Sequence, residues 1–423
     1  MMMKYKISDI CDLNLCSITN KDKIENIMYL DTSSITNNNI ELLQPFSIKV
    51  APSRAKRKVK NNTIIYSTVR PNLKHFGILK NPADNMIVST GFTTIDVKDK
   101  YKEEIDAEYI YLLLTNQSVV DYLSTMAESA VSAYPSINPD DIGELRFDFP
   151  NIDMQRKIAA AVFSIEEKIA LNTRMNAELE AMAKQLYDYW FVQFDFPDEN
   201  GKPYKSSGGK MVYNEKLKRE IPEGWEVKCL NQLVDSYRGV TYNKDDLVAK
   251  SKDSVLVLRG NNIPTSGQFA YDSNVAYIPK KMVSYEQKIR KGDIIITMSS
   301  GSKDHIGKCY MFQSSSNHTF GAFLSKCAPH DGLNYFVYCS MLSDLFKAFV
   351  KTTCNGTGIN NLTTETLNNV HFPIPNEKTL SIFESSVGKL YSLVGKEQNE
   401  IYFLTHLRDY LLPMLMNGQV TVE

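Results

Sequence analysis

The chain has 423 residues, of which 43% are hydrophobic and 23% are charged, a composition that excludes disordered and fibrous proteins. One hydrophobic core rarely serves a chain of this length, so we expect at least two domains. The net charge of −1 gives no general attraction for phosphate groups, which taken alone counts against nucleic-acid binding.

The N-terminal residues lack the apolar core of a signal peptide, and no segment has the length of an apolar membrane span, which predicts a cytoplasmic protein without membrane contact. The seven cysteines are odd in number and form no Cys-x-x-Cys pair. This pattern argues against a zinc site and a disulfide framework, and it predicts reduced, mostly packed thiols.

Residues 1–152 form the first predicted globular domain. Short apolar runs bounded by turn residues, at 63–67 and 86–89, predict strands, and a helix is expected near 107–126.

Charge is unevenly distributed in this domain. From Leu42 to Ala83 there is no Asp or Glu, which predicts a polarised surface. Arg, Lys, Asn and small hydroxyl residues on loops beside a strand are groups that bind phosphates and reach base edges. The candidates for DNA contact are therefore Arg54, Lys56, Arg57, Lys58, Ser67, Thr68, Arg70, Asn72, Lys74 and His75. A solvated basic face is the alternative that this segment leaves open.

Residues 153–196 predict one long helix, because they contain no Pro or Gly and place mostly apolar residues at alternating steps of four and three. The predicted heptad seam comprises Ile158, Val162, Ile165, Ile169, Asn172, Asn176, Leu179, Ala183, Leu186 and Trp190. The two asparagines are expected to form polar layers that fix the register at some cost in stability. Residues 197–224 follow as a polar linker whose Gly, Ser and Asn clusters indicate turns or flexibility.

Residues 225–375 form a second globular domain that repeats the first. Ile64-Ile65 recurs as Ile294-Ile295 and Gly91 as Gly321 at one constant offset, whereas Phe147 recurs as Phe372 at a slightly shorter offset. The change of offset predicts that the loop near residues 98–106 is shorter in the second copy. Strands are expected at 254–258 and 293–298, and a helix at 333–351.

The polar loop after the strand recurs at 297–305 with different side chains, as expected if the two copies contact different sequences. Its candidates are Ser299, Ser302, Lys303 and His305. The equivalent His75 and His305 are either DNA contacts or structural hydrogen bonders. Arg259 and Asn261 follow the strand at 254–258 and either contact DNA or form a turn.

Residues 376–423 form the second long helix. Its seam, which lies at the same shorter offset from the first seam, comprises Phe383, Val387, Leu390, Val394, Glu397, Ile401, Leu404, Arg408, Leu411 and Leu415. The matched seams predict that the two helices pair as an antiparallel coiled coil with pseudo-two-fold symmetry. The helix ends carry more apolar residues than one seam needs. They either bind a partner protein or pack on the globular domains, and the partner candidates are Tyr187, Trp190, Phe191, Leu411 and Leu415.

The sequence contains no Walker-type phosphate loop, no amino-methyltransferase motif of the Asn-Pro-Pro-aromatic kind and no convincing cluster of metal carboxylates. We therefore expect no catalytic site, no metal and no cofactor bound by this chain. A nuclease or methyltransferase with an unrecognised active site is one alternative. A coiled-coil scaffold without a DNA role is another, and the basic stretch before Arg70 argues against it.

This organisation resembles the specificity subunit of type I restriction-modification enzymes over essentially the whole chain. Phrases similar to that family are Pro52-Ser53-Arg54-Ala55, the run 67–71, the run 189–197, and Ile221-Pro222-Glu223-Gly224-Trp225. The first half lacks an Ile-Pro-x-Gly-Trp entry, which leaves the start of its domain less defined.

The resemblance implies an α+β protein in which two target recognition domains each bind one half of a split double-stranded DNA target. It implies that the paired helices set the gap between the halves and that the ends of these helices hold two methyltransferase subunits, which restriction/translocase subunits join. Adenine-N6 methylation with S-adenosylmethionine, and cleavage with ATP and magnesium, would then occur in those partners. The target sequence cannot be read from the side chains, because contacts do not map to bases one to one.

Overall fold

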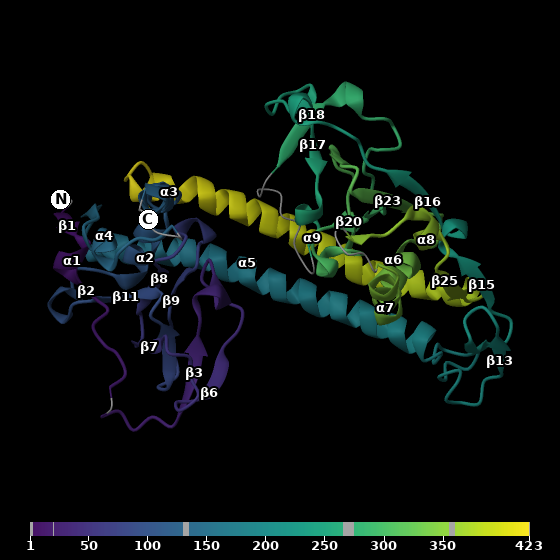
Figure 1. The fold of residues 1–423 in the computed structure, drawn as a ribbon, viewed down its shortest axis with the longest axis horizontal. Helices are drawn as coiled ribbons and strands as arrows, with labels where there is room; N and C mark the ends of the chain where they lie inside the picture. The colour runs from purple at the N-terminus through teal and green to yellow at the C-terminus, as the bar shows by residue number, and fades with distance from the viewer. Residues whose placement is uncertain (1–2, 20, 130–134, 265–274, 355–359, 423) are drawn as a thin grey trace. The chain divides into compact units, whose positions relative to one another are not determined.

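The computed structural model describes residues 3–19, 21–129, 135–264, 275–354 and 360–422, and it separates into two compact units. The first unit comprises residues 1–167 with 404–423, and the second comprises residues 168–403. Helices and strands are mixed in both units, so the fold is α+β (Figure 1). No helix among the described residues is both long and apolar enough to cross a membrane.

Two four-stranded sheets form the globular part of the first unit. One has the order β6-β3-β10-β7, with β3 (Asn26–Leu30), β6 (Gln44–Ser47), β7 (Ala55–Lys58) and β10 (Met86–Ser89). The other has the order β2-β11-β8-β9, with β2 (Cys11–Leu13), β8 (Ile64–Ser67), β9 (Phe76–Ile78) and β11 (Phe92–Val97). Strands β8 and β10 are buried along their whole length, which explains their continuous apolar sequences.

Smaller elements complete this domain. Strand β1 (Met3–Lys6) pairs with β12 (Arg146–Phe149), and β4 (Ile35–Thr36) forms a hairpin with β5 (Asn39–Ile40). The helices are α1 (Ile7–Ile10), α2 (Ala107–Thr115), α3 (Gln117–Ser129) and α4 (Pro139–Gly143).

The second unit repeats these pairings. One sheet has the order β16-β23-β19-β21, with β16 (Val234–Arg238), β19 (Ile294–Thr297), β21 (Cys309–Met311) and β23 (Leu324–Pro329). Another has the order β18-β17-β22, with β17 (Ser254–Leu258), β18 (Ala276–Pro279) and β22 (His318–Phe320). Two further strand pairs are β15 (Glu226–Cys229) with β25 (His371–Ile374) and β20 (Ser299–Ser300) with β24 (Asn360–Asn361). The helices of this domain are α6 (Asn334–Leu342), α7 (Asp344–Thr353) and α8 (Thr364–Asn368).

Strand registers define the repeat more finely than the sequence does. The connection from β11 to α2 spans 98–106, whereas that from β23 to α6 spans only 330–333, so the predicted shorter loop is confirmed. The match of Gly91 with Gly321 is wrong. Ser67 pairs with Phe92 and Thr297 with Leu324, so the counterpart of Gly91 is Phe323.

Each single helix predicted within a domain is in fact two helices. The break falls at Asn116 in the first domain, where Asn116 Oδ1 accepts a hydrogen bond from the Ser118 N–H at 3.1 Å. It falls at Ser343 in the second, where Ser343 Oγ accepts from the Phe346 N–H at 3.2 Å. Small polar side chains at these positions cap the second helix of each pair.

The two long helices are α5 (Ile152–Tyr187), which continues into a π-helical turn at Asp188–Val192, and α9 (Glu377–Met416). Every predicted seam position on both helices is buried or half-buried. In the first unit, Ile158 and Val162 of α5 and Leu415 of α9 join the core of the first domain. In the second unit, the end of α5 and the start of α9 join the core of the second domain.

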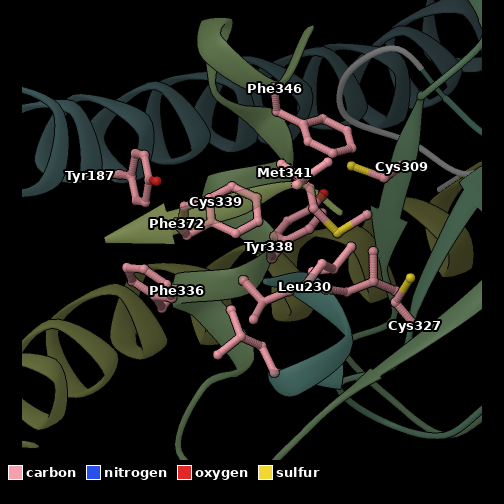
Figure 2. Packing of buried hydrophobic residues seen from close by; sticks show 14 of the residues in the cluster. Tyr187, Leu230, Cys309, Cys327, Phe336, Tyr338, Cys339, Met341, Phe346 and Phe372 are labelled. Atoms are coloured by element: carbon pink, nitrogen blue, oxygen red, sulfur yellow. The ribbon is translucent and has the colours of Figure 1, made fainter. Parts of the chain in front are cut away.

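This second core is rich in aromatic side chains (Figure 2). Tyr187 of α5 lies 6.0 Å from Phe336 of α6 and 6.2 Å from Phe383 of α9, measured between ring centroids. Each globular domain therefore packs on the start of the helix that follows it and on the end of the other helix.

The predicted polar linker is ordered in the structure. Strands β13 (Met211–Asn214) and β14 (Arg219–Pro222) form a hairpin, and Phe196 stacks on Tyr204 at 4.7 Å. A Cβ at Gly209 would overlap the ring of Tyr204, so only glycine fits there. Aromatic packing against Trp225, 4.9 Å from Phe196, overrides the turn-forming composition of this segment.

Candidate nucleic-acid interface

Sheet topology brings four loops of the first domain to one edge. Strands β3 and β10 are parallel, so the residues after both lie at the same end of the sheet. Strand β7, antiparallel to β10, begins at that end, and β8 ends beside the start of β11. We call this set of residues the first loop edge; it comprises residues 31–34, 54, 68–75 and 90–91.

Backbone hydrogen bonds tie these loops together. The Thr90 N–H donates to Arg54 O at 2.8 Å, and the Thr68 N–H donates to Gly91 O at 3.0 Å. A Cβ at Gly91 would lie 2.8 Å from Thr32 Cγ2, so the turn between β10 and β11 packs closely against the segment after β3. The edge is thus one connected surface rather than four independent loops.

The loop after β8 is held in a strained conformation. Arg70 and Lys74 have φ angles of 49° and 57°, in the left-handed region that non-glycine residues rarely adopt. The segment after α3 supports them, because the Arg70 N–H donates to Pro135 O and the Ile137 N–H donates to Thr68 O, both at 2.9 Å. A loop that is fixed in this way presents its side chains in a set geometry.

The predicted basic stretch divides into exposed and engaged residues. Arg54 and Lys56 are exposed, as is Asn72 in the next loop. Lys58 forms an ion pair with Asp22, in which Lys58 Nζ also donates a hydrogen bond to Asp22 Oδ1. This hydrogen bond lowers the pKa of the Asp22 carboxyl to about 2. Arg57 is half-buried, with Nη1 3.5 Å from Asn14 O, and burial lowers its pKa.

Three other candidates are engaged within the domain. Ser67 is 2% exposed and donates its hydroxyl to Val69 O at 3.0 Å, so the expectation of a DNA contact there is wrong. His75 Nδ1 lies 2.6 Å from Ile35 O, which favours the alternative of a structural hydrogen bonder. Lys74 Nζ donates to Gln117 Oε1 at 2.8 Å.

The second domain builds an equivalent edge. Strand β17 is parallel to β22, so Arg259 and the turn after β22 lie at the same end. The Gly321 N–H donates to Leu258 O and the Met298 N–H donates to Phe323 O, both at 2.9 Å. The second loop edge comprises residues 259–262, 298–305 and 321–323.

The support of the loop after the strand also recurs. The Leu362 N–H donates to Met298 O at 2.8 Å, just as Ile137 donates to Thr68 in the first domain. Ser302 and His305 are exposed and Ser299 is half-buried, while the side chain of Lys303 lies outside the described part of the chain. Asn261 is exposed, and Arg259 Nε donates to the Tyr242 hydroxyl at 3.0 Å.

Several residues of these edges were missed by the sequence analysis. They are Asp31, Ser33 and Thr90 in the first domain and Phe323, which is 67% exposed, in the second. A usable signal existed: Asp31 follows an apolar strand at Asn26–Leu30 in the same way that Arg259 follows Ser254–Leu258. That segment has no recognisable identity between the copies, so self-comparison did not align it.

The residues proposed for partner binding at the helix ends lie inside the protein. Tyr187, Trp190, Phe191 and Leu415 are at most 6% exposed, and Leu411 is half-buried against the first core. This burial corrects the expectation that they form a surface, because packing on the globular domains consumes their apolar area.

A different set of apolar side chains on the long helices is exposed, and each directly precedes a seam position. On α5 these are Leu171, Met175 and Met182, Tyr189 lies in the π-helical turn that follows α5, and on α9 they are Ile382, Leu393, Phe403, Leu407 and Tyr410. Met182 is 53% exposed, and Leu407, its counterpart in the repeat, is 45% exposed. We call these nine residues the outer stripe.

Among the described residues, no group of three or more His, Cys, Asp or Glu side chains is placed to hold a metal ion. None of the seven cysteines, all of which the structure describes, forms a disulfide, and five of them are buried.

Comparison with known proteins shows that residues 1–181 and 222–402 each match the family model described as type I restriction modification DNA specificity domain. The HindI type I restriction enzyme specificity subunit of Haemophilus influenzae is 24% identical over 476 residues, covering 99% of both chains. The MjaIX specificity subunit of Methanocaldococcus jannaschii is 27% identical over 365 residues, covering 85% of this chain and 78% of the relative. The crystal structure of a type I S subunit from M. genitalium has a TM-score of 0.57 at 15% identity, covering 98% of this chain and 96% of that one.

Proposed function

The chain belongs to the type I restriction modification DNA specificity family, and from this premise we propose that its two loop edges contact the two halves of a split DNA target. It is a specificity subunit, a DNA-recognition component rather than a catalytic one. The observation that carries the proposal is the double occurrence of one loop arrangement with different side chains. A common scaffold with different polar groups is what two different half-sites require.

Not every candidate contributes in the same way to this proposal. Arg54, Lys56, Arg70 and Asn72 in the first domain, and Arg259, Asn261, Ser299, Ser302 and His305 in the second, belong to the edges or adjoin them. Arg54, Lys56 and Arg70 supply phosphate contacts, while residues that directly follow a strand, such as Arg259, are positioned for base edges. Lys58 and His75 instead hold the domain together.

The long helices are proposed to pair as an antiparallel coiled coil with pseudo-two-fold symmetry and to set the gap between half-sites. Contacts within each unit support this pairing. In the second unit, Asn172 Nδ2 of α5 donates to Glu400 Oε2 of α9 at 2.7 Å. In the first unit, Arg408 of α9 lies 3.9 Å from Glu166 of α5.

We assign the outer stripe to the methyltransferase partners. Met182 and Leu407 occupy matching positions on the two helices of the repeat, which provides equivalent places for two copies of one subunit. Exposed apolar residues at helical spacing suit the packing of a partner helix. Restriction/translocase subunits would join this complex in the cytoplasm, and S-adenosylmethionine, ATP and magnesium would be bound by the partners.

A substitution test distinguishes specific binding at the outer stripe from nonspecific binding to exposed apolar residues. Met182→Glu together with Leu407→Glu should abolish co-purification of the methyltransferase subunit, because a buried carboxylate without a partner is costly. Val212→Glu is the control, since Val212 is also exposed, at 46%, but lies on the β13–β14 hairpin. Equal loss in both variants would contradict the assignment.

The function is tested by methylome sequencing of a strain with and without the gene. Loss of a two-part adenine motif on deletion is the expected result. Methylation or cleavage by the isolated chain would instead favour the alternative of an unrecognised active site. Assembly with partners but no DNA discrimination would favour a scaffold.

A further inference from the structure

The two loop edges differ in charge at the residue that directly follows β3 in the first domain and β17 in the second. Val88 of β10 pairs with Leu30 of β3, and Phe320 of β22 pairs with Leu258 of β17. The next residue is Asp31 in the first domain and Arg259 in the second, so a carboxylate and a guanidinium occupy equivalent positions. A short 3-10 turn follows each of them, at Thr32–Ser34 and Gly260–Asn262.

The Asp31 carboxylate is held at the edge by two hydroxyl groups. Oδ1 accepts from the Tyr29 hydroxyl at 2.9 Å, and Oδ2 accepts from the Ser33 hydroxyl at 3.2 Å. Tyr29 is buried within β3, so one of the two anchors is part of the rigid core. An ionised carboxylate has about four acceptor positions, so these bonds fix its orientation without exhausting its capacity.

The Arg259 guanidinium is fixed by Tyr242, which lies in the loop after β16. Its Nε donates to the Tyr242 hydroxyl at 3.0 Å, and its backbone N–H donates to Asn262 Oδ1 at 2.8 Å. The turn beyond β22 adjoins it, because the Gly321 N–H donates to the carbonyl of Leu258. The bond from Nε sets the plane of the guanidinium, while bidentate contacts to guanine use its terminal nitrogens.

Charge decides what each side chain can recognise on DNA. A carboxylate is repelled by phosphate and accepts a hydrogen bond from the exocyclic amino group of cytosine. A guanidinium in a fixed plane donates two hydrogen bonds to O6 and N7 of guanine. Resting on the proposed function, we propose that Asp31 and Arg259 are equivalent specificity-determining residues, each recognising a G·C pair in its own half-site, Asp31 through cytosine and Arg259 through guanine.

The first test changes Asp31→Asn in the assembled methyltransferase. The amide replaces an acceptor with a donor at nearly the same volume, so discrimination for one G·C pair of the first half-site should fall by roughly 5- to 140-fold. The second half-site should keep its preference. The measurement is binding to a panel of DNA duplexes in which every base pair of both half-sites is varied in turn, supported by methylome sequencing. Asp99→Asn is the control, because Asp99 is an exposed carboxylate of the same domain, paired with Lys102.

The second test changes Arg259→Lys, which keeps the positive charge and removes the bidentate geometry. Discrimination should fall at one G·C pair of the second half-site by a similar factor, with the first half-site unchanged. Tyr29→Phe guards against a folding defect in the first domain. It keeps the carboxylate but removes one of its hydrogen-bond anchors. It should therefore reduce discrimination at the same base pair that Asp31→Asn affects, by a smaller factor.

The outcomes separate this inference from the function on which it rests. Unchanged discrimination at every position, a change at an A·T pair, or a uniform loss of binding by folded variants would each overturn the base-reading role. The wild-type enzyme would still methylate a split target in all three cases. Failure of the function itself would appear as the absence of any split motif in the wild-type methylome.

Discussion

Arg54 and Arg57 are close in sequence but lie in different environments. Arg54 is exposed directly before β7 and belongs to the first loop edge, whereas Arg57 is half-buried against Asn14. Arg54→Ala should weaken DNA binding and reduce the slope of log affinity against log salt by about 1, because one phosphate contact is lost. Arg57→Ala should leave that slope unchanged. Titrations of the assembled enzyme between low and moderate salt measure both, and equal slopes for the two variants would contradict the distinction.

The ion pair of Asp22 with Lys58 gives a pH-dependent contribution to stability. The pKa of Asp22 is about 2 in the folded protein, because of its hydrogen bond to Lys58, against about 3.9 in an unfolded chain. A lowered pKa stabilises the fold above pH of about 4, and this contribution is lost as the pH falls toward 2. Asp22→Asn should therefore make the unfolding free energy less dependent on pH in that window. Urea unfolding at several pH values tests this, and parallel curves for the two proteins would refute it.

At the residue scale, the sequence predicted which side chains are basic but not which are engaged. Lys56 and Lys58 are neighbouring alternatives in the same run, and only the fold brings Asp22 to one of them. Asp31 was missed because its role depends on the parallel pairing of β3 with β10, a strand much later in the chain. Local pattern carries no information about such a partner.

At the scale of elements, the long helices were the most predictable part of the chain. Heptad periodicity is a local property, and every seam position is indeed buried or half-buried. The strand β7 was not expected within the basic stretch, because pairing with β10 outweighs its weak local preference. The hairpin β13–β14 was also missed, because the segment that contains it is ordered by the packing of Phe196 on Tyr204 and Trp225 rather than by its local composition.

The polar middle of the seam has a cost that can be measured. Asn176 is 1% exposed, and neither its Oδ1 nor its Nδ2 has a hydrogen-bond partner among the described residues. Asn176→Leu should raise the free energy of unfolding by about 1 to 3 kcal/mol, because a buried amide without partners is removed. Asn172→Leu is the matched comparison and should gain less, since Asn172 donates to Glu400. Denaturant unfolding of both variants would contradict the argument if Asn172→Leu were the more stable.

At the scale of the whole molecule, the proposed pairing of α5 with α9 predicts that the helices act as a ruler, which means that their length sets the spacing between the two half-sites of the DNA target. Four extra residues near Asn172 lengthen a helix by about 6 Å, which corresponds to at most about two base pairs of B-DNA. Four residues nearly preserve the orientation of the seam, whereas two would rotate it by about 200°. The insertion should therefore lengthen the unread gap of the target and leave both half-sites unchanged. Methylome sequencing decides, and a folded, active variant restricted to the original spacing would rule the ruler out.

The membership of residues 404–423 in the first unit has a consequence for how the protein is made. Leu415 is buried in the same core as Ile158 and Val162, yet the whole second unit, 168–403, is synthesised between them. At typical rates of translation this delay lasts about 12 to 50 s. During that time the apolar start of α5 lacks the end of α9, on which it packs in the folded protein. The second unit is continuous in sequence and can close before the first is complete. The N-terminal half of this chain therefore leaves the ribosome first and finishes folding last.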